Sequence, residues 1–178
     1  VQLLESIIED FGLEVKKKTK IELYKQLNHF LLGELKAGNN VVLIIDEAQN
    51  LKNSILEEIR LLTNLETEKE KLCQIILVGQ PELRDKLNSP SLEQLRQRIA
   101  VRYHIMPLFE DEIPEYINHR LTIAGSRGDI IFEDSAIDTI FELTEGIPRL
   151  INIICDRALL LGYILETNKI TSDMIKKS

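Results

Sequence analysis

The chain has 178 residues, of which 44% are hydrophobic and 29% charged, so it has the composition of one folded domain, with or without a small appendage. Its 22 basic and 29 acidic side chains leave a net charge of −7, which argues against a dedicated, broadly basic nucleic-acid binder. No apolar run approaches the roughly 20 residues that span a bilayer, and the two cysteines lack the spacing of a zinc site or a disulfide framework, so we expect a cytosolic protein.

The first forty residues predict two amphipathic helices. Apolar residues recur at helical spacing from Leu3 to Phe11, and Gly12 is placed to end that helix. Thr19 and Glu22 fit a capping box, which opens a second helix that ends near residue 38.

Three apolar runs then predict strands that alternate with helices. Val41–Ile45 is an unbroken, largely β-branched run, which is typical of a parallel strand buried on both faces. Ile75–Val78 predicts a second strand and Val101–Ile105 a third, which is interrupted at Pro107. An amphipathic helix lies between the first two strands, so we expect an α/β core with a parallel sheet.

The pattern changes after Pro107, because no later run is typical of a strand. Apolar residues recur at helical spacing around 113–121, 137–141 and 151–165, and Pro148 stands where the first turn of a helix tolerates it. We therefore expect the last 70 or so residues to be all-helical.

The strongest motif is the apolar run that ends in Asp46 and Glu47, which has the Walker B pattern. A buried parallel strand delivers such carboxylates to the sheet edge where ligands bind. The first carboxylate helps to hold a hydrated Mg²⁺ ion, and the second orients or polarises an attacking water. A strand that ends in a solvated acidic turn explains this motif equally well when the motif is taken alone.

Weaker candidates follow along the chain. Gln80 stands at the tip of the second strand, where its side chain would reach a phosphate or a water, although such segments are more often plain turns. Arg96, Arg98 and Arg102 precede or enter the third strand and are individually best explained as surface residues. Arg149 lies in the first turn of a helix, where the helix dipole disfavours a cation. This placement favours contact with an anionic ligand, although the penalty is small enough to permit a plain surface arginine.

Taken in order, these motifs are far more specific than any one of them. The chain resembles the AAA+ ATPases, and more closely the ATPase domain of the general secretion pathway protein A family. The segments that carry this resemblance cover nearly the whole chain and are residues 41–51, 57–67, 74–87, 95–108 and 146–163.

The resemblance implies ATP and Mg²⁺ as cofactors and a role for each candidate. Asp46 corresponds to the Walker B aspartate, which holds Mg²⁺ through water, and Glu47 to the catalytic glutamate. Gln80 corresponds to the sensor 1 residue. Arg98 is the best of the three arginines for an arginine finger that reaches a neighbouring subunit, and Arg149 corresponds to sensor 2.

One departure from the family is serious, because the sequence contains no phosphate-binding loop of the form G-x-x-x-x-G-K-[ST]. The resemblance then makes residues 1–107 the C-terminal part of an AAA+ core and residues 108–178 its helical lid. Since the chain begins at Val1, we expect a truncated ATPase and not a degenerate one. We also expect weak or no ATP hydrolysis by this chain alone, and exposed apolar surface where the strand before the loop would lie.

Several functions stay open at this point. In the family that the chain resembles, the ATPase forms oligomers and works with a membrane partner to assemble a secretion machine. A helper ATPase of DNA transposition has the same motif order but should carry a stronger basic stripe than Lys16–Lys20. A non-catalytic interaction module would explain the missing loop. A helicase with a DEAD-type box is disfavoured, because Gly79-Gln80-Pro81 stands where its Ser-Ala-Thr-like motif belongs.

Overall fold

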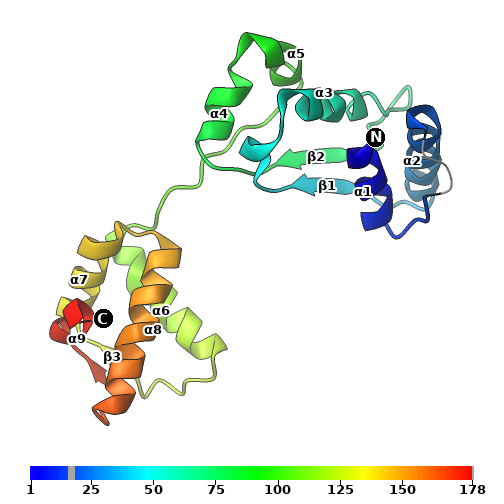
Figure 1. Ribbon diagram of the computed structural model, residues 1–178. Coiled ribbons are helices and arrows are strands. Elements are labelled where there is room, and N and C mark those ends of the chain that lie inside the picture. The colour runs from blue at the N-terminus through cyan, green and yellow to red at the C-terminus, as the bar shows by residue number, and fades with distance from the viewer. Residues whose placement is uncertain (16–18, 178) are drawn as a thin grey trace. The chain divides into compact units, whose positions relative to one another are not determined.

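The computed structural model describes residues 1–15 and 19–177, which divide into two compact units, Val1–Arg102 and Tyr103–Ser178 (Figure 1). Each unit has a hydrophobic core of its own. Residues 16–18, which belong to the basic stripe Lys16–Lys20, lie outside the described residues. None of the helices in the described ranges has the length and apolar character needed to cross a membrane.

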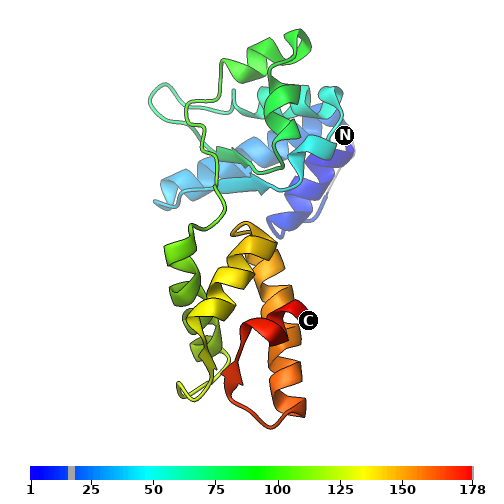
Figure 2. The ribbon, with the colours of Figure 1, turned by 90° about the vertical axis from the view of Figure 1, so that its left-hand side faces the viewer.

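Helices α1 (Gln2–Asp10) and α2 (Lys20–Lys36) pack against each other in the first unit (Figures 1 and 2). Thr19 caps α2 as predicted, because its side-chain oxygen accepts the backbone N–H of Glu22 at 3.4 Å and its hydroxyl donates to the Glu22 carboxylate at 2.7 Å. The side chains that these two helices bury almost completely are Leu4, Ile7, Ile8, Leu23, Leu27 and Leu31.

Strands β1 (Val42–Ile45) and β2 (Gln74–Leu77) form a two-stranded parallel sheet, which confirms the α/β core. Val42 lies opposite Gln74 and Ile45 opposite Leu77, so both carboxyl ends finish at the same edge. One face of the sheet packs against the helices of this unit through Leu43, Ile45, Ile75 and Leu77.

The other face of the β1–β2 sheet is exposed. Ile44 is 62% exposed, and Val42, Ile76 and Val78 on the same face are also exposed. The prediction of strands buried on both faces is therefore wrong for this face, because nothing among the described residues packs on it. Apolar surface was expected to be exposed where a missing neighbouring strand would pair, at a sheet edge. The surface exposed here is instead a face of the sheet, which a packing helix would cover.

Short helical segments follow each strand. The 3₁₀ turn η1 (Ala48–Asn50) and helix α3 (Asn53–Leu62) lie between the strands. Helix α4 (Glu82–Leu87), the 3₁₀ turn η2 (Pro90–Leu92) and helix α5 (Glu93–Arg96) follow β2. Leu56 and Ile59 of α3 pack with Leu92 and Leu95, and this second cluster also covers the inner face of the sheet.

A lysine of α4 fastens the turn that follows β1. The Nζ atom of Lys86 donates hydrogen bonds to the backbone carbonyl oxygens of Gln49 and Leu51, each at 2.6 Å, and the site is partly buried. Two charge-assisted hydrogen bonds from one ammonium group therefore hold the backbone next to Asp46 and Glu47 in place.

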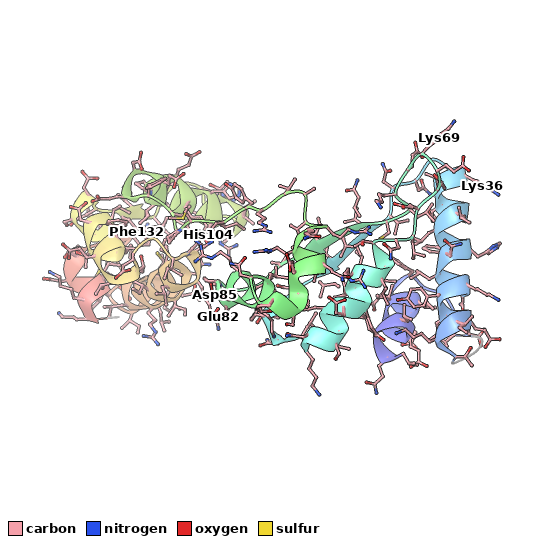
Figure 3. All side chains as sticks on the ribbon, turned by 90° about the horizontal axis from the view of Figure 1, so that it is seen from above. Lys36, Lys69, Glu82, Asp85, His104 and Phe132 are labelled. Carbon is pink, nitrogen blue, oxygen red and sulfur yellow. The ribbon has the colours of Figure 1, made fainter. Side chains whose placement is uncertain are left out.

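The third strand predicted at Val101–Ile105 does not form, because residues 99–109 contain no helix or strand. Tyr103 is 89% exposed, and Val101 and Ile105 are exposed as well. A strand needs a neighbour to pair its N–H and C=O groups, and this segment has none among the described residues. His104, which falls within the segment expected to form this strand, is also exposed (Figure 3).

The second unit is mainly helical, as predicted. Its core is formed by side chains that include Ile113, Ile140, Ile151, Ile170 and Ile175. Its helical elements are η3 (Glu110–Glu112), α6 (Ile113–Ile123), α7 (Asp134–Thr144), α8 (Pro148–Ile164) and α9 (Ser172–Lys177).

The second unit also contains a strand pair that the sequence interpretation missed. Strands β3 (Ile131–Phe132) and β4 (Lys169–Ile170) pair in parallel. Two residues are too few to show the alternation by which a strand is recognised, so the expectation of an all-helical part is wrong in this detail.

Gly146 makes the sharp turn between α7 and α8. Its φ is +74°, and it follows Glu145, which is also left-handed with φ +49°. The carbonyl oxygen of Gly146 accepts the backbone N–H of Leu108 at 2.9 Å. A Cβ atom at this position would lie 1.9 Å from the carbonyl oxygen of Leu108, so only glycine fits here.

We predict that Gly146→Ala destabilises the chain far more than Gly128→Ala. Gly128 has a similar φ of +83°, but a Cβ atom there would have no neighbour within 4 Å, so that substitution costs only backbone strain of about 1 kcal/mol. Gly146→Ala adds a backbone clash and should cost about 3 kcal/mol or more. Urea unfolding followed by circular dichroism measures both values, and equal losses would contradict the steric argument.

We also predict that Lys86→Met lowers the free energy of unfolding by about 2 kcal/mol, because methionine keeps the apolar stem but donates no hydrogen bond. Lys25→Met, on the exposed side of α2, is the matched control and should change it by less than about 0.5 kcal/mol. The same urea titration distinguishes the two. A Lys86→Met variant as stable as the control would mean that water replaces the ammonium group.

Candidate functional site

The two acidic residues that follow β1 lie in a tight turn. Asp46 Oδ1 accepts the backbone N–H of Glu47 at 2.7 Å. Glu47 has a left-handed backbone with φ 52° and ψ 33°, which is uncommon for a residue with a side chain. Both side chains are exposed, and no lysine or arginine of the described ranges forms an ion pair with either. The turn therefore presents two carboxylates with no neutralising partner in this part of the chain.

Backbone hydrogen bonds join this turn to the end of β2. The N–H of Val78 donates to the carbonyl oxygen of Ile45, and the N–H of Ala48 donates to the carbonyl oxygen of Val78, both at 2.9 Å. Ala48 is completely buried. The backbone of Gln80, two residues beyond Val78, therefore lies next to the acidic turn.

Gln49 connects the two turns through its side chain, and the sequence interpretation missed this residue as part of the site. Its Nε2 atom donates to Glu47 Oε2 at 2.7 Å, and its Oε1 atom accepts the backbone N–H of Gln80 at 3.2 Å. Asn50 Nδ2 makes a longer contact of 3.4 Å with the same Glu47 oxygen. The only signal in the sequence was the position of Gln49, two residues beyond Glu47 in the run 46–50.

Gly79 leaves the space that Gln49 occupies. A Cβ atom on Gly79 would lie 2.5 Å from Gln49 Oε1 and 3.1 Å from Leu83 Cδ2. The close packing of Gln49 and Leu83 therefore explains why glycine precedes Gln80. A larger residue would push the Gln49 amide away from the Gln80 backbone.

Within the described residues, none of the three candidate arginines forms an ion pair with Asp46 or Glu47. Arg96 ends α5, and its carbonyl oxygen accepts an N–H from Arg102 at 3.4 Å. Arg98 is exposed just beyond α5. Lys71 lowers the pKa of Glu66 through a hydrogen bond and its charge, and Arg98 adds the smallest contribution. Within the described ranges, no hydrogen bond or ion pair joins Arg98 to Asp46 or Gln80.

Arg149 belongs to the second unit and lies in the first turn of α8. It is exposed, and no acidic residue occupies that first turn. The residue before the helix, Ile147, provides no side-chain cap. Pro148 opens α8 without an N–H group, and the N–H of Leu150 already donates to the carbonyl oxygen of Ile147 at 2.9 Å. The guanidinium and the backbone N–H of Arg149 are thus the groups at this helix end that suit an anion. Since the two units are described separately, this end is not placed relative to Asp46.

Within the described residues, neither the cysteines nor any cluster of metal-ligating side chains offers a second catalytic site. No group of three or more His, Cys, Asp or Glu side chains in the described ranges is arranged to hold a metal ion. Burial raises the pKa of Cys155 to about 12, so its thiol stays protonated and unreactive near neutral pH. Cys73 is half-buried, and burial raises its pKa as well. These findings agree with cysteines that act as small hydrophobic residues.

The chemistry that this arrangement permits follows from its groups. Two exposed carboxylates and an amide stand where the carboxyl ends of β1 and β2 meet, which is the edge where α/β sheets bind ligands. The free oxygen of Asp46 and the absence of a bound cationic side chain suit a hydrated Mg²⁺ ion. The groups that would grip the phosphates, a glycine-rich loop and its lysine, are absent from the sequence.

Known proteins resemble this chain in sequence. A family model described as "AAA domain" matches residues 1–87. General secretion pathway protein A of Aeromonas hydrophila is 44% identical over 169 residues, which cover 94% of this chain and 31% of that protein. An uncharacterized HTH-type transcriptional regulator of Methanocaldococcus jannaschii is 29% identical over 84% of this chain and 37% of that protein. The chain thus spans about a third of the length of the curated relatives it matches.

Solved structures share the fold at lower sequence identity. The ORC2 protein of Aeropyrum pernix, in its ADPNP–ADP complexes, has a TM-score of 0.71 at 14% identity over 98% of this chain and 47% of that one. The RuvB Holliday junction branch migration motor of Thermotoga maritima has a TM-score of 0.60 at 19% identity over 84% of this chain and 47% of that one. These structures and the parallel β1–β2 pair show the fold. The match to the AAA domain model and the 44% identity over most of the chain show that the chain belongs to the AAA+ ATPases and, among them, to the general secretion pathway protein A family.

Proposed function

We propose that this chain supplies the water-activating half and the lid of an ATP-hydrolysing AAA+ module of the general secretion pathway protein A type. The observation that carries the proposal is the pair of hydrogen-bonded turns after β1 and β2, where Gln49 bonds both the Glu47 carboxylate and the Gln80 backbone. A plain acidic turn would need no such link to the neighbouring strand. The 44% identity to a secretion protein over most of the chain supports the same assignment.

Each residue has a role in this proposal. Bound Mg²⁺ would neutralise phosphate charge, and Asp46 would hold it through a water molecule. Glu47 would orient or polarise the attacking water, and Gln80 would position the water or the terminal phosphate. Arg98, which is exposed and forms no ion pair with Asp46 or Glu47 within the described ranges, would reach the site of a neighbouring subunit. Arg149 would contact the phosphates from the lid.

The module also needs a phosphate-binding loop, which these 178 residues lack. The strand that precedes such a loop would pair along an edge of the two-stranded β1–β2 sheet. The exposed face, where Val42 and Ile44 offer apolar surface, is suited to be covered by a helix that packs on the completed sheet. We therefore propose that this chain by itself hydrolyses ATP weakly or not at all. The activity would belong to an assembly in which a loop of that kind is present.

The cellular role that we propose is work on a secretion complex. It rests on the name of the Aeromonas hydrophila relative, and it implies a homo-oligomer that acts in the cytoplasm on a membrane-anchored partner. The Holliday junction branch migration named for the Thermotoga maritima structure is a property of a protein only 19% identical to this chain, so that similarity supports the fold alone. The net charge of −7 also disfavours a DNA-wrapping role.

We predict that grafting this chain into the Aeromonas hydrophila protein, in place of the aligned 169 residues, gives a chimera that hydrolyses Mg-ATP. Glu47→Gln in the chimera should lower kcat by about two orders of magnitude or more, because the amide cannot polarise the water, and should leave nucleotide affinity within about twofold. The control is Glu82→Gln, at an exposed acidic residue of the neighbouring helix α4 (Figure 3), which should leave kcat and nucleotide affinity unchanged. Steady-state phosphate release and fluorescent-nucleotide binding measure the two quantities. An active Glu47→Gln chimera would refute the assignment.

We further predict that Arg98→Ala lowers kcat of the chimera by about 10³-fold while nucleotide binding persists. The sharper test is to mix Arg98→Ala and Glu47→Gln subunits, because an intact Glu47 then meets an intact Arg98 at some interfaces. Activity should reappear in the mixture. Arg84→Ala, an exposed arginine on α4, is the control. If Arg98→Ala stays active, or if mixing restores nothing, Arg98 does not act across subunits.

A further inference from the structure

A hollow lies in the second unit, between the start of α6 and the first turns of α7. Its volume is about 640 Å³. Its lining belongs entirely to residues 109–141, so it is a feature of this unit alone and is separate from the Asp46–Glu47 turn. The side chains that line it are Phe109, Glu110, Asp111, Pro114, Asp134, Ile137, Asp138 and Phe141.

Phe109 contributes an aromatic ring that its own unit does not bury. The residue is 67% exposed. Its backbone is nevertheless fixed, because its N–H donates to a Glu112 carboxylate oxygen at 2.8 Å and its carbonyl oxygen accepts the Glu112 N–H at 3.1 Å. Leu108, one residue earlier, donates its N–H to Gly146. A large apolar group is thus held ready on a rigid backbone, which reduces the entropy lost on binding.

Helix α7 supplies the other wall. Asp134, Ile137, Asp138 and Phe141 follow the spacing i, i+3, i+4 and i+7, so they share one face of the helix. Ile137 is buried against the core, and Phe141 is half-buried. The hollow therefore has an apolar floor that continues the core of the unit, with carboxylates along the same helix face.

Four carboxylates surround the apolar floor, those of Glu110, Asp111, Asp134 and Asp138. No basic side chain lines the hollow, and none of the described lysines or arginines forms an ion pair with these four. Residues 103–178 hold thirteen acidic and seven basic side chains, so six of the seven net negative charges of the chain lie in this unit. The hollow is apolar at its centre and strongly acidic at its rim.

We infer that this hollow is a docking groove for a basic, amphipathic helix of a partner protein. Aliphatic or aromatic side chains of that helix would cover Phe109, Ile137 and Phe141, and its flanking lysines or arginines would face the four carboxylates. A helix fits better than an added strand, because the walls are helical and no strand edge lines the groove. Lipid headgroups that are anionic and nucleic acids are disfavoured by the negative charge. The inference does not depend on ATP hydrolysis by this chain.

The experiment uses the full 178-residue chain and a fluorescein-labelled amphipathic helical peptide of leucine and lysine. Fluorescence anisotropy should show saturable binding that weakens as salt is added. Two probes of matched length serve as controls, one with glutamate in place of lysine and one with the leucines and lysines scrambled so that no apolar face remains. Both should bind at least about tenfold more weakly, and amide shifts in NMR spectra with the first peptide should centre on residues 109–114 and 134–141.

Variants separate the groove from general charge attraction. Phe109→Ala and Asp138→Lys should each weaken binding of the leucine–lysine peptide by about tenfold or more. Asp156→Lys, an exposed acid of α8 that does not line the groove, makes the same change of net charge and should weaken binding by less than about twofold. Because Phe109 and Asp138 are exposed, both variants should keep the circular dichroism spectrum of the parent chain.

Three results would overturn the inference. Equal losses for Asp138→Lys and Asp156→Lys would show attraction to net charge alone. If the scrambled peptide binds as tightly as the amphipathic one, the hollow does not recognise the apolar face of a helix. A concentration-dependent dimer that Phe109→Ala abolishes, seen by sedimentation without any peptide, would show that the groove receives a second copy of this chain.

Discussion

The hydrogen bonds between the two turns that follow β1 and β2 are the constraint on which the candidate site depends. The backbone pairs Val78 with Ile45 and Ala48, and the side chain of Gln49 then joins the Glu47 carboxylate to the backbone of Gln80. A lysine of α4 fastens the same turn. Because these contacts come from two strands and a helix, the positions of the two carboxylates are set by the packing of the whole first unit.

That packing is one-sided. The helices cover the face of the sheet that carries Leu43 and Ile75, whereas Ile44 and Ile76 face outwards. The site therefore lies at the edge of a sheet that has one face covered by helices and one face exposed to solvent. An element that packs on the open face would bury apolar area and change the surroundings of Asp46 at the same time, so completion of the fold and completion of the site are physically linked.

Features that depend on local pattern could be predicted from the sequence. The Thr19 cap, the first two strands and the acidic pair at their sheet edge follow from spacing and residue type. The segment Val101–Ile105 has strand-forming residues, but a strand also needs a partner, and composition says nothing of one; β3 and β4 are too short for any periodicity to show. Gln49 and Lys86 were beyond prediction, because their roles depend on which carbonyl or amide a flexible side chain meets in three dimensions. The role of Arg98 rests on the family resemblance, because an arginine finger acts on the site of another subunit and a single chain has no such neighbour.

The left-handed backbone of Glu47 has a consequence for the stability of the fold. Glu145 and Glu166 share this conformation, but they follow helices, where a left-handed residue is ordinary. Glu47 instead follows a strand, and glycine would adopt its φ without the strain of about 1 kcal/mol that a side chain brings. A sequence selected for thermodynamic robustness alone would place glycine or asparagine there. The glutamate therefore leaves some backbone strain in the turn. A variant with glycine or asparagine at this position should relieve that strain and raise the melting temperature, but it would also lose the carboxylate.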